Sequence, residues 1–333
     1  MQRTVIGLDI GHSSVKAVAV SSSGRHQFLF PSVAIPAFAI SDEGEARIAA
    51  AETVAVGQRK YFVGETALVQ SCGQPPALGL TNDWIETPEH SALIAGAAKK
   101  LELLGVDLRN CLVVTGLPSA LHTHQKARMR EVVRQQIQAE VLVAPQPFGP
   151  LQTLMLTPAG TLSSHHDMRT ENWAVVEIGH FTTDFLLIQS GRIVEKASGS
   201  CGGVRLAVEH MQRLLNQENI QVDHFEAEQA LRERRIKYFG KALDVTEYAK
   251  QSISLIASEV MDTASRVLDS VARKLDGILI AGGGAPVIFP ELSLKWPHAT
   301  IANEPRMAIA EGFCRFGMSI SNKTHGAQEP AKA

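Results

Sequence analysis

Short apolar runs along the chain are separated by longer stretches in which apolar residues recur every three or four positions. A buried strand needs only a short apolar run, so we predict strands at residues 5–10, 111–118, 141–144, 175–178 and 277–281. Helical spacing of apolar residues predicts helices at residues 91–104, 122–137 and 252–275. Strands that alternate with helices in this way indicate an α/β protein whose sheets are flanked by helices.

One pattern of strand, acidic residue, glycine turn and hydroxyl pair occurs twice. The two copies read Asp9-Ile10-Gly11-His12 followed by Ser13-Ser14, and Glu177-Ile178-Gly179-His180 followed by Thr182-Thr183. A second apolar run follows each copy, which predicts an antiparallel hairpin. We therefore predict a duplicated domain with one phosphate-binding hairpin in each half.

The duplication sets the expected domain boundaries. We predict a first domain at residues 1–165 and a second at residues 166–320. Each domain contains a segment whose composition differs from its surroundings, which predicts insertions at about residues 31–88 and 205–250. The first insertion contains short strand candidates at residues 53–56 and 60–63. The segment 321–333 is polar and lacks an apolar face, so we expect it to be disordered.

Composition narrows the class of protein. The chain has 333 residues, of which 45% are hydrophobic and 20% charged, with a formal net charge of −2. A net charge this close to zero does not indicate direct binding to nucleic acid, so we expect any contact with DNA to be made through a partner protein. The four cysteines form no CxxC and indicate neither a zinc site nor a disulfide framework. We see no signal peptide and no apolar run of about 18 residues, so we expect a cytoplasmic protein without a membrane span.

The first hairpin carries the side chains that a nucleotide site needs. Asp9 at a strand end suits a hydrated Mg²⁺, which is commonly held by one or two carboxylates and by phosphates. The small-residue loop 11–14 offers backbone N–H groups and serine hydroxyls to an anion, and Lys16 adds a positive charge. Taken alone, an acid before a glycine turn also fits a purely structural role.

Three further segments admit a functional and a structural interpretation. Gln146, at the end of a predicted strand, either orients an attacking water or is a loop amide. Gly202 and Gly203 lie in a predicted loop at residues 199–203 that leads into a helix, whose N-terminus either approaches a phosphate or follows a simple turn. Gly282, Gly283 and Gly284 allow a flat group to approach the backbone, whereas neither a GxGxxG nor a P-loop string is present.

The residues His165, His166 and Asp167 superficially resemble a metal cluster. Adjacent histidines in a loop or strand point apart, so we do not expect them to bind a metal ion.

Five motifs in order resemble those of the actin, sugar-kinase and DnaK ATPase superfamily. They are VIGLDIGHSSVKAV, LVVTGLP, VVEIGHFTTDF, ILIAGGGAPVI and AIAEG, and they extend from Val5 to the region of Gly317. The strings TGLP and IAEGFCRFG are most similar to the ParM/StbA group of actin-like plasmid-segregation ATPases. The resemblance implies duplicated actin-like (ribonuclease H-like) domains with mixed sheets, ATP and Mg²⁺ in a cleft between them, polymerisation into filaments, and an adaptor bound to centromere-like DNA.

The resemblance also assigns roles to residues. Asp9 would position Mg²⁺; Gly11, His12, Ser13, Ser14 and Lys16 would hold phosphates; and Gln146 would lie near the attacking water. The opposing loop would comprise Gly179, His180, Thr182 and Thr183, while Gly282, Gly283 and Gly284 would underlie the adenine and ribose. Asp184 is expected to tie the hairpin together. Glu177 stands where the family usually has aspartate, so its carboxylate would reach about one bond further toward the metal or its water.

The leading hypothesis is an ATPase, with GTP as the alternative nucleotide, that polymerises with itself and segregates plasmid DNA through a DNA-bound adaptor. A sugar-type kinase is the first alternative, but it needs a catalytic base where Gln146 provides only an amide. A DnaK-like or PilM-like scaffold ATPase is the second alternative.

Overall fold

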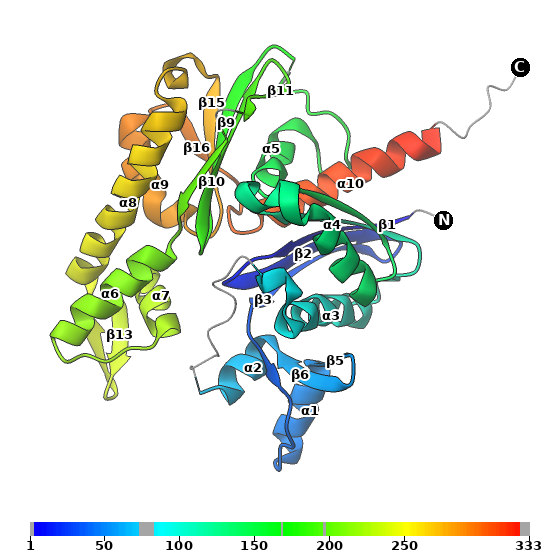
Figure 1. Ribbon diagram of the computed structural model, residues 1–333, viewed down its shortest axis with the longest axis vertical. Coiled ribbons are helices and arrows are strands. Elements are labelled where there is room, and N and C mark those ends of the chain that lie inside the picture. The colour runs from blue at the N-terminus through cyan, green and yellow to red at the C-terminus, as the bar shows by residue number, and fades with distance from the viewer. Residues whose placement is uncertain (1–2, 73–82, 168, 196–197, 327–333) are drawn as a thin grey trace, which may run out of the picture. The chain divides into compact units, whose positions relative to one another are not determined.

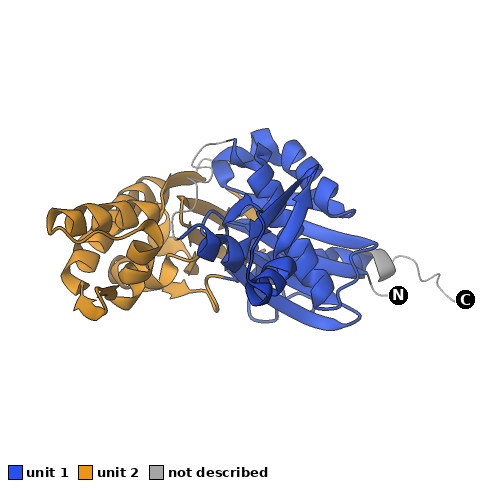
Figure 2. Ribbon diagram, turned by 90° about the horizontal axis from the view of Figure 1, so that it is seen from below, with its two compact units in different colours: residues 1–167, 307–333 blue, residues 168–306 orange. Residues whose placement is uncertain are grey.

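A computed structural model describes residues 3–72, 83–167, 169–195 and 198–326. The chain forms two compact units, coloured separately in Figure 2. Unit 1 comprises Met1–Asp167 and Met307–Ala333, and unit 2 comprises Met168–Arg306. Each unit is built on its own mixed sheet.

Unit 1 is organised around a five-stranded sheet with the order β3-β2-β1-β7-β8 (Figure 1). The strands β1, β2 and β3 are antiparallel, whereas β1, β7 and β8 are parallel. Every residue of β1 and β7 is buried, which explains their continuous apolar runs. The strands are β1 (Thr4–Ile10), β2 (Ser14–Ser21), β3 (Gly24–Pro31), β7 (Cys111–Leu117) and β8 (Glu140–Pro145).

Helices pack on both faces of this sheet. The inward side chains of β1, such as Ile6 and Leu8, belong to a core shared with α3 and α4, and Val5 belongs to a second core shared with α10. These helices are α3 (Pro88–Leu103), α4 (Ser119–Gln136), α5 (Phe148–Met155) and α10 (Ala308–Gly326). The predicted helices at 91–104 and 122–137 are therefore confirmed, with ends shifted by one to three residues.

The last helix belongs to unit 1, although we expected residues up to 320 to lie in the second domain. The reason is close packing: a Cβ on Gly7 would lie 2.0 Å from the carbonyl oxygen of Ala310, and one on Gly312 would lie 1.7 Å from that of Gly149. Only glycine permits such an approach of backbones. Residues 321–326 continue α10 rather than forming the start of a disordered tail, and residues 327–333 lie outside the described residues.

The first insertion forms a small subdomain of unit 1. Its three-stranded sheet has the order β4-β6-β5, and both strand candidates are confirmed. Its elements are β4 (Ala34–Pro36), α1 (Glu43–Ala51), β5 (Thr53–Val56), β6 (Arg59–Val63), α2 (Gly64–Gln70) and the 3₁₀ turn η1 (Trp84–Glu86).

Unit 2 repeats the sheet plan of unit 1. Its path is β11-β10-β9-β15-β16, with β12 paired to β10; β9 and β10 are antiparallel, whereas β9, β15 and β16 are parallel. The antiparallel hairpin beside a parallel partner confirms the predicted duplication. The strands are β9 (Asn172–Ile178), β10 (Thr182–Gln189), β11 (Arg192–Ile193), β12 (Gly199–Gly202), β15 (Gly277–Ala281) and β16 (Ala299–Ile301).

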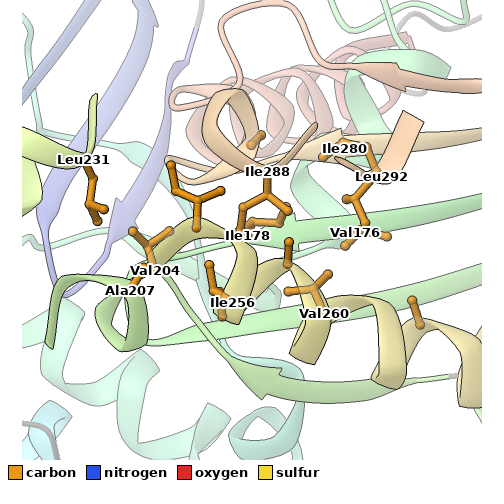
Figure 3. Close-up of a cluster of buried hydrophobic side chains, with 14 of the residues drawn as sticks. Val176, Ile178, Val204, Ala207, Leu231, Ile256, Val260, Ile280, Ile288 and Leu292 are labelled. Carbon is orange, nitrogen blue, oxygen red and sulfur yellow. The ribbon is translucent and has the colours of Figure 1, made fainter. Parts of the chain in front are cut away.

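One face of this sheet contributes to a large apolar core (Figure 3). Val176 and Ile178 of β9 and Ile280 of β15 pack there with Val204, Ile256, Val260 and Ile288. The helices of the unit are α6 (Arg205–Gln217), α7 (His224–Glu233), α8 (Thr246–Leu268) and α9 (Ala285–Lys295), joined by the hairpin β13 (Arg235–Tyr238) and β14 (Lys241–Asp244) and the 3₁₀ turn η3 (Ala272–Lys274).

Two predicted elements of unit 2 differ from the structure. The helix α8 covers Thr246–Leu268 instead of residues 252–275, and the segment Gly199–Gly202 is a strand instead of a loop. Local glycine content suggested a loop, but pairing with β10 extends the sheet over these residues. Within the described parts of the chain, no helix combines the length and apolar character needed to cross a bilayer.

Candidate functional site

The two hairpins have the same turn. In unit 1 the N–H of Gly11 donates to the carbonyl of Ser14 at 3.2 Å, and in unit 2 the N–H of Gly179 donates to that of Thr182 at 2.9 Å. A Cβ on Gly11 would lie 2.8 Å from Nζ of Lys16, and one on Gly179 would lie 2.9 Å from the carbonyl oxygen of Thr182. A side chain at either turn would therefore meet its neighbours closely, and at Gly179 the neighbour is backbone, which cannot move aside easily.

In unit 1, the carboxylate of Asp9 lies between a cation and an amide. Lys16 Nζ contacts Asp9 Oδ2 at 2.9 Å, and Gln146 Nε2 donates to Asp9 Oδ1 at 3.1 Å. Lys16 comes from the position directly opposite Asp9 in β2, whereas Gln146 follows β8. Asp9 is only 1% exposed and the Lys16 side chain 12% exposed, so this is a largely buried ion pair. The structure thus brings together the acid, the cation and the amide that the sequence singled out.

The turn of the first hairpin is supported by an aromatic stack. The ring of His12 stacks on Trp84 at 4.1 Å between centroids, and Trp84 meets the edge of His90 at 4.7 Å. Burial, with a smaller contribution from the nearby His12, lowers the pKa of His90 to about 3. His90 is therefore neutral at physiological pH, and the stack holds the His12 end of the loop against the helix α3. Ser13 lies in the same turn, and Ser14, which is buried, begins β2.

In unit 2, two acids take the corresponding positions. Glu177 lies directly opposite Asp184 in the β9–β10 ladder, as Asp9 lies opposite Lys16 in unit 1. Both carboxylates are buried, and Asp184 Oδ2 accepts a hydrogen bond of 2.9 Å from Thr182 Oγ1. The two hairpins therefore share a backbone plan but differ in charge, because a lysine in one is replaced by an aspartate in the other. The contact with Thr182 agrees with a role for Asp184 in tying the hairpin.

The glycines of unit 2 divide into packed and open positions. Gly282 has a φ of +93°, and a Cβ there would lie 2.3 Å from the carbonyl oxygen of Ile178 and 2.5 Å from Glu177 Oε1. A Cβ on Gly284 would lie 2.3 Å from a methyl group of Val204. Gly283, in contrast, has its nearest neighbour 4.0 Å away, at Cγ of Arg306. Gly283 is thus the position of the three that leaves space beside the backbone.

Gly202 and Gly203 use their backbone N–H groups within the protein. The N–H of Gly202 donates to Glu259 Oε1 at 2.9 Å, and that of Gly203 donates to the carbonyl of Phe181 at 3.0 Å. The buried hydroxyl of Thr183 donates to the carbonyl of Gly202 at 3.0 Å. The bonds to Phe181 and Thr183 join the segment before α6 to the second hairpin. Both glycine N–H groups thus have partners within the protein, which favours the structural interpretation of this pair over direct contact with a phosphate.

Three residues near the second hairpin were missed by the sequence analysis. Arg306 lies beside Gly283, and desolvation lowers its pKa. His224 and Glu228 of α7 approach His180 in the hairpin turn. Arg306 comes from the linker before α10, and His224 and Glu228 come from the second insertion. No local sequence pattern indicates that these residues lie near the hairpin.

The residues of both units fit the chemistry of Mg²⁺ and a nucleotide. Asp9 and Glu177 are strand-end carboxylates of the kind that hold a hydrated hard cation, although both oxygens of Asp9 already have protein partners. This arrangement suits an indirect contact through metal-bound water better than direct coordination. Lys16 offers positive charge to phosphates, whereas the N–H groups of Gly11 and Gly179 already donate within their own hairpins.

Comparisons with known proteins agree with the duplicated plan. Residues 7–149 match the family model of the N-terminal domain of actin-like proteins, and residues 175–294 match that of the C-terminal domain of archaeal MreB-like actin homologues. The chain is therefore an actin-like protein with one matching domain in each half. Comparison with curated protein sequences gave no match.

Solved structures of actin homologues have the same fold. The chain is similar to ParM in a 15-stranded filament from Clostridium botulinum, with a TM-score of 0.73 and 18% identity over 95% of this chain and 99% of that chain. It is similar to Alp7A, with a TM-score of 0.72 and 13% identity over 98% and 99%. An archaeal actin homologue in complex with ADP has a TM-score of 0.67 and 19% identity over 94% and 98%.

Proposed function

We propose that this protein binds Mg-ATP through its two hairpins, hydrolyses the nucleotide and polymerises into filaments. The observation that carries the proposal is the buried carboxylate of Asp9, held between Lys16 at 2.9 Å and Gln146 at 3.1 Å. A buried acid with a cation on one oxygen and an amide on the other is a costly arrangement for stability alone. It is the arrangement expected where charge and water must be positioned beside phosphates.

In the proposed hydrolysis, Gln146, Lys16 and the two carboxylates have different roles. Gln146 donates to Asp9 with Nε2, so its orientation is fixed and its Oε1 offers an acceptor that aligns the attacking water. Lys16 would supply positive charge to the phosphates, and Asp9 and Glu177 are the carboxylates that would hold a hydrated Mg²⁺. When bound, Mg²⁺ neutralises charge that develops on the transferred phosphoryl group.

Assembly and partners form the second part of the proposal. The relative from Clostridium botulinum is a filament, and Alp7A and ParM are actin-like proteins of the same fold. We infer self-assembly of this chain on that likeness, with a DNA-bound adaptor as its partner and plasmid segregation in the cytoplasm as its role. The net charge of −2 supports an adaptor rather than direct contact with DNA.

A sedimentation assay with parallel phosphate release tests the proposal. The purified chain is mixed with Mg²⁺ and ATP, GTP or ADP, and pellets are examined by negative-stain microscopy. We expect filaments and phosphate release with a triphosphate, and pelleting without turnover for Asp9→Ala and Glu177→Ala. Absence of both filaments and phosphate release with every nucleotide would overturn the proposal, and phosphorylated product from sugars would point to the kinase alternative.

A further inference from the structure

Three metal-binding side chains converge in unit 2. His180 comes from the turn between β9 and β10, whereas His224 and Glu228 come from the first two turns of α7. One ligand atom from each residue lies within 4.8 Å of the other two. Among the residues that the structure describes, this is the group of three or more histidine, cysteine and acidic side chains with such spacing.

The distances within this cluster are close to those around a bound ion. His224 Nε2 lies 3.2 Å from His180 Nε2, and their rings meet edge to face with centroids 5.2 Å apart. Two ligands on a tetrahedral zinc ion with bonds of about 2.0–2.1 Å are roughly 3.3 Å apart. His180 Nδ1, the other nitrogen of that ring, lies 3.5 Å from Glu228 Oε2. An ion binds only one nitrogen of an imidazole ring, so side-chain rotations are needed to bring all three groups to one ion.

The backbone around the cluster is well anchored. Asp223 and Glu226 form a reciprocal capping box at the start of α7, with hydrogen bonds of 2.8 and 2.9 Å, which fixes the first turn that carries His224. The carbonyl of His180 accepts a hydrogen bond of 2.8 Å from the N–H of Arg205. A Cβ on Gly203 would lie 2.6 Å from that same carbonyl oxygen, so the turn is packed tightly against α6.

The hydrogen bonding of His180 leaves a ring nitrogen for a ligand. Its Nδ1 is buried without a hydrogen bond, which leaves a polar atom unsatisfied inside the unit. The same Nδ1 lies 3.5 Å from Glu228 Oε2, so an ion bound by both atoms would satisfy it. Imidazole nitrogen is a common ligand of zinc and related ions.

Nearby positive charge restricts the kind of ion. Arg232 donates to Glu228 Oε1 at 2.7 Å, and Arg205 and Arg306 also lie within electrostatic reach of the cluster. These guanidinium groups oppose any cation that binds through charge alone, such as Mg²⁺ or Ca²⁺. Ions that bind imidazole strongly, such as Zn²⁺, Co²⁺, Ni²⁺ and Cu²⁺, are affected less.

We propose that His180, His224 and Glu228 form a binding site for a divalent transition-metal ion of the zinc type. The ion binds one nitrogen of each imidazole and Oε2 of Glu228, and any proton that it displaces from a ring nitrogen passes to solvent. Three protein ligands leave a fourth position for water or for an anion. The ion thereby joins the turn of the second hairpin to the inserted helix α7. The three protein ligands need no nucleotide, so this site is tested separately from the proposed nucleotide hydrolysis.

Cobalt titration of the full chain tests the site without any nucleotide. The chain is freed of metal with a chelator and titrated with Co²⁺, whose visible absorption intensifies on tetrahedral coordination. We expect one equivalent to bind, to be displaced by Zn²⁺ and to be unaffected by excess Mg²⁺. The variants His224→Ala and Glu228→Gln should each weaken Co²⁺ binding by at least about tenfold.

The control is the double variant His165→Ala/His166→Ala, which removes the adjacent histidines of the loop before β9. It should bind Co²⁺ like the wild type. The proposal is overturned if the wild type shows no tetrahedral spectrum, if the control loses the spectrum, or if His224→Ala retains wild-type affinity. Circular dichroism of each variant establishes that it is folded, and Glu228→Gln, which keeps the size of the side chain, provides the test if an alanine variant does not fold.

Discussion

The side-chain nitrogen of Gln146 lies 3.1 Å from Oδ1 of Asp9, although the two residues are 137 positions apart in the chain. The other oxygen of Asp9 contacts Lys16 at 2.9 Å. A single buried carboxylate therefore fixes both the amide proposed to align water and the cation proposed to contact phosphates. A substitution of one of the three side chains should therefore change the position or hydrogen bonding of the other two.

Replacing Gln146 by alanine should slow nucleotide hydrolysis about ten- to a hundredfold while assembly with ATP persists. The physical reason is that the variant loses the acceptor that aligns water but keeps Lys16 and Asp9. Phosphate release and sedimentation measured on the same samples check this. The matched control is Gln135→Ala, an exposed amide on α4, which should leave the rate unchanged. Equal rates for Gln146→Ala and wild type would remove Gln146 from the proposed mechanism.

Replacing Lys16 by methionine should lower the free energy of unfolding by about 3 kcal/mol, because the buried Asp9 loses its cationic partner. Urea denaturation followed by circular dichroism measures the change. The double variant Asp9→Asn/Lys16→Met removes both charges and should recover part of the loss. The exposed Lys60 provides the control, since Lys60→Met should change stability by less than about 0.5 kcal/mol. Full stability of Lys16→Met would contradict the assigned importance of the pair.

Replacing Gly282 by alanine should destabilise the protein by at least about 2 kcal/mol, through backbone strain and overpacking. The new methyl group would lie 2.3 Å from the carbonyl oxygen of Ile178, at a φ of +93°. The adjacent Gly283 is the control, since its nearest neighbour would be 4.0 Å away and its φ lies outside the left-handed region. Thermal unfolding of the two alanine variants should therefore differ clearly, and similar melting temperatures would argue against the packing assigned to Gly282.

The buried His90 should make the protein less stable in mild acid. Its pKa is about 3 in the folded chain and 6.5 as a free side chain, so the unfolded state binds the proton more readily. The contribution of the neutral form is complete above pH 6.5 and is lost as the pH falls toward 3. Between pH 7.5 and pH 5 this amounts to about 2 kcal/mol.

Urea denaturation at the two pH values isolates this effect when wild type is compared with His90→Leu. Other groups titrate in both proteins, so the variant should lose about 2 kcal/mol less than the wild type on acidification. The exposed His124 serves as the control, because His124→Leu should follow the wild type. An identical loss for wild type and His90→Leu would refute the burial-driven origin of the pKa shift.

The repeated parts of the fold could be predicted from sequence because they are encoded locally. The hairpins at Gly11 and Gly179 are each specified by an apolar run, a turn glycine and a second apolar run. The strand β15 was predicted with both its ends, because its five residues are all buried and glycines follow it. Where the signal depends on partners distant in sequence, as for β12, local composition gave the wrong element.

The site was only partly predictable for the same reason. Asp9 and Lys16 face each other in neighbouring strands, so their contact follows from the hairpin register. The approach of Gln146 to Asp9 requires the order β1-β7-β8 in the sheet, which no local pattern in the sequence specifies. The cluster of His180, His224 and Glu228 forms because α7 of the second insertion packs beside the hairpin turn. No spacing of residues in the sequence predicts that contact.

The return of α10 to unit 1 has a consequence for the order of events during protein synthesis. Unit 2 is continuous in sequence from Met168 to Arg306, whereas unit 1 needs residues from both ends of the chain. A ribosome therefore releases every residue of unit 2 before it releases the helix that completes the core around Val5 and Phe313. Unit 2 is translated after most of unit 1, yet its polypeptide is complete first, and one face of the sheet of unit 1 lacks α10 until that helix emerges.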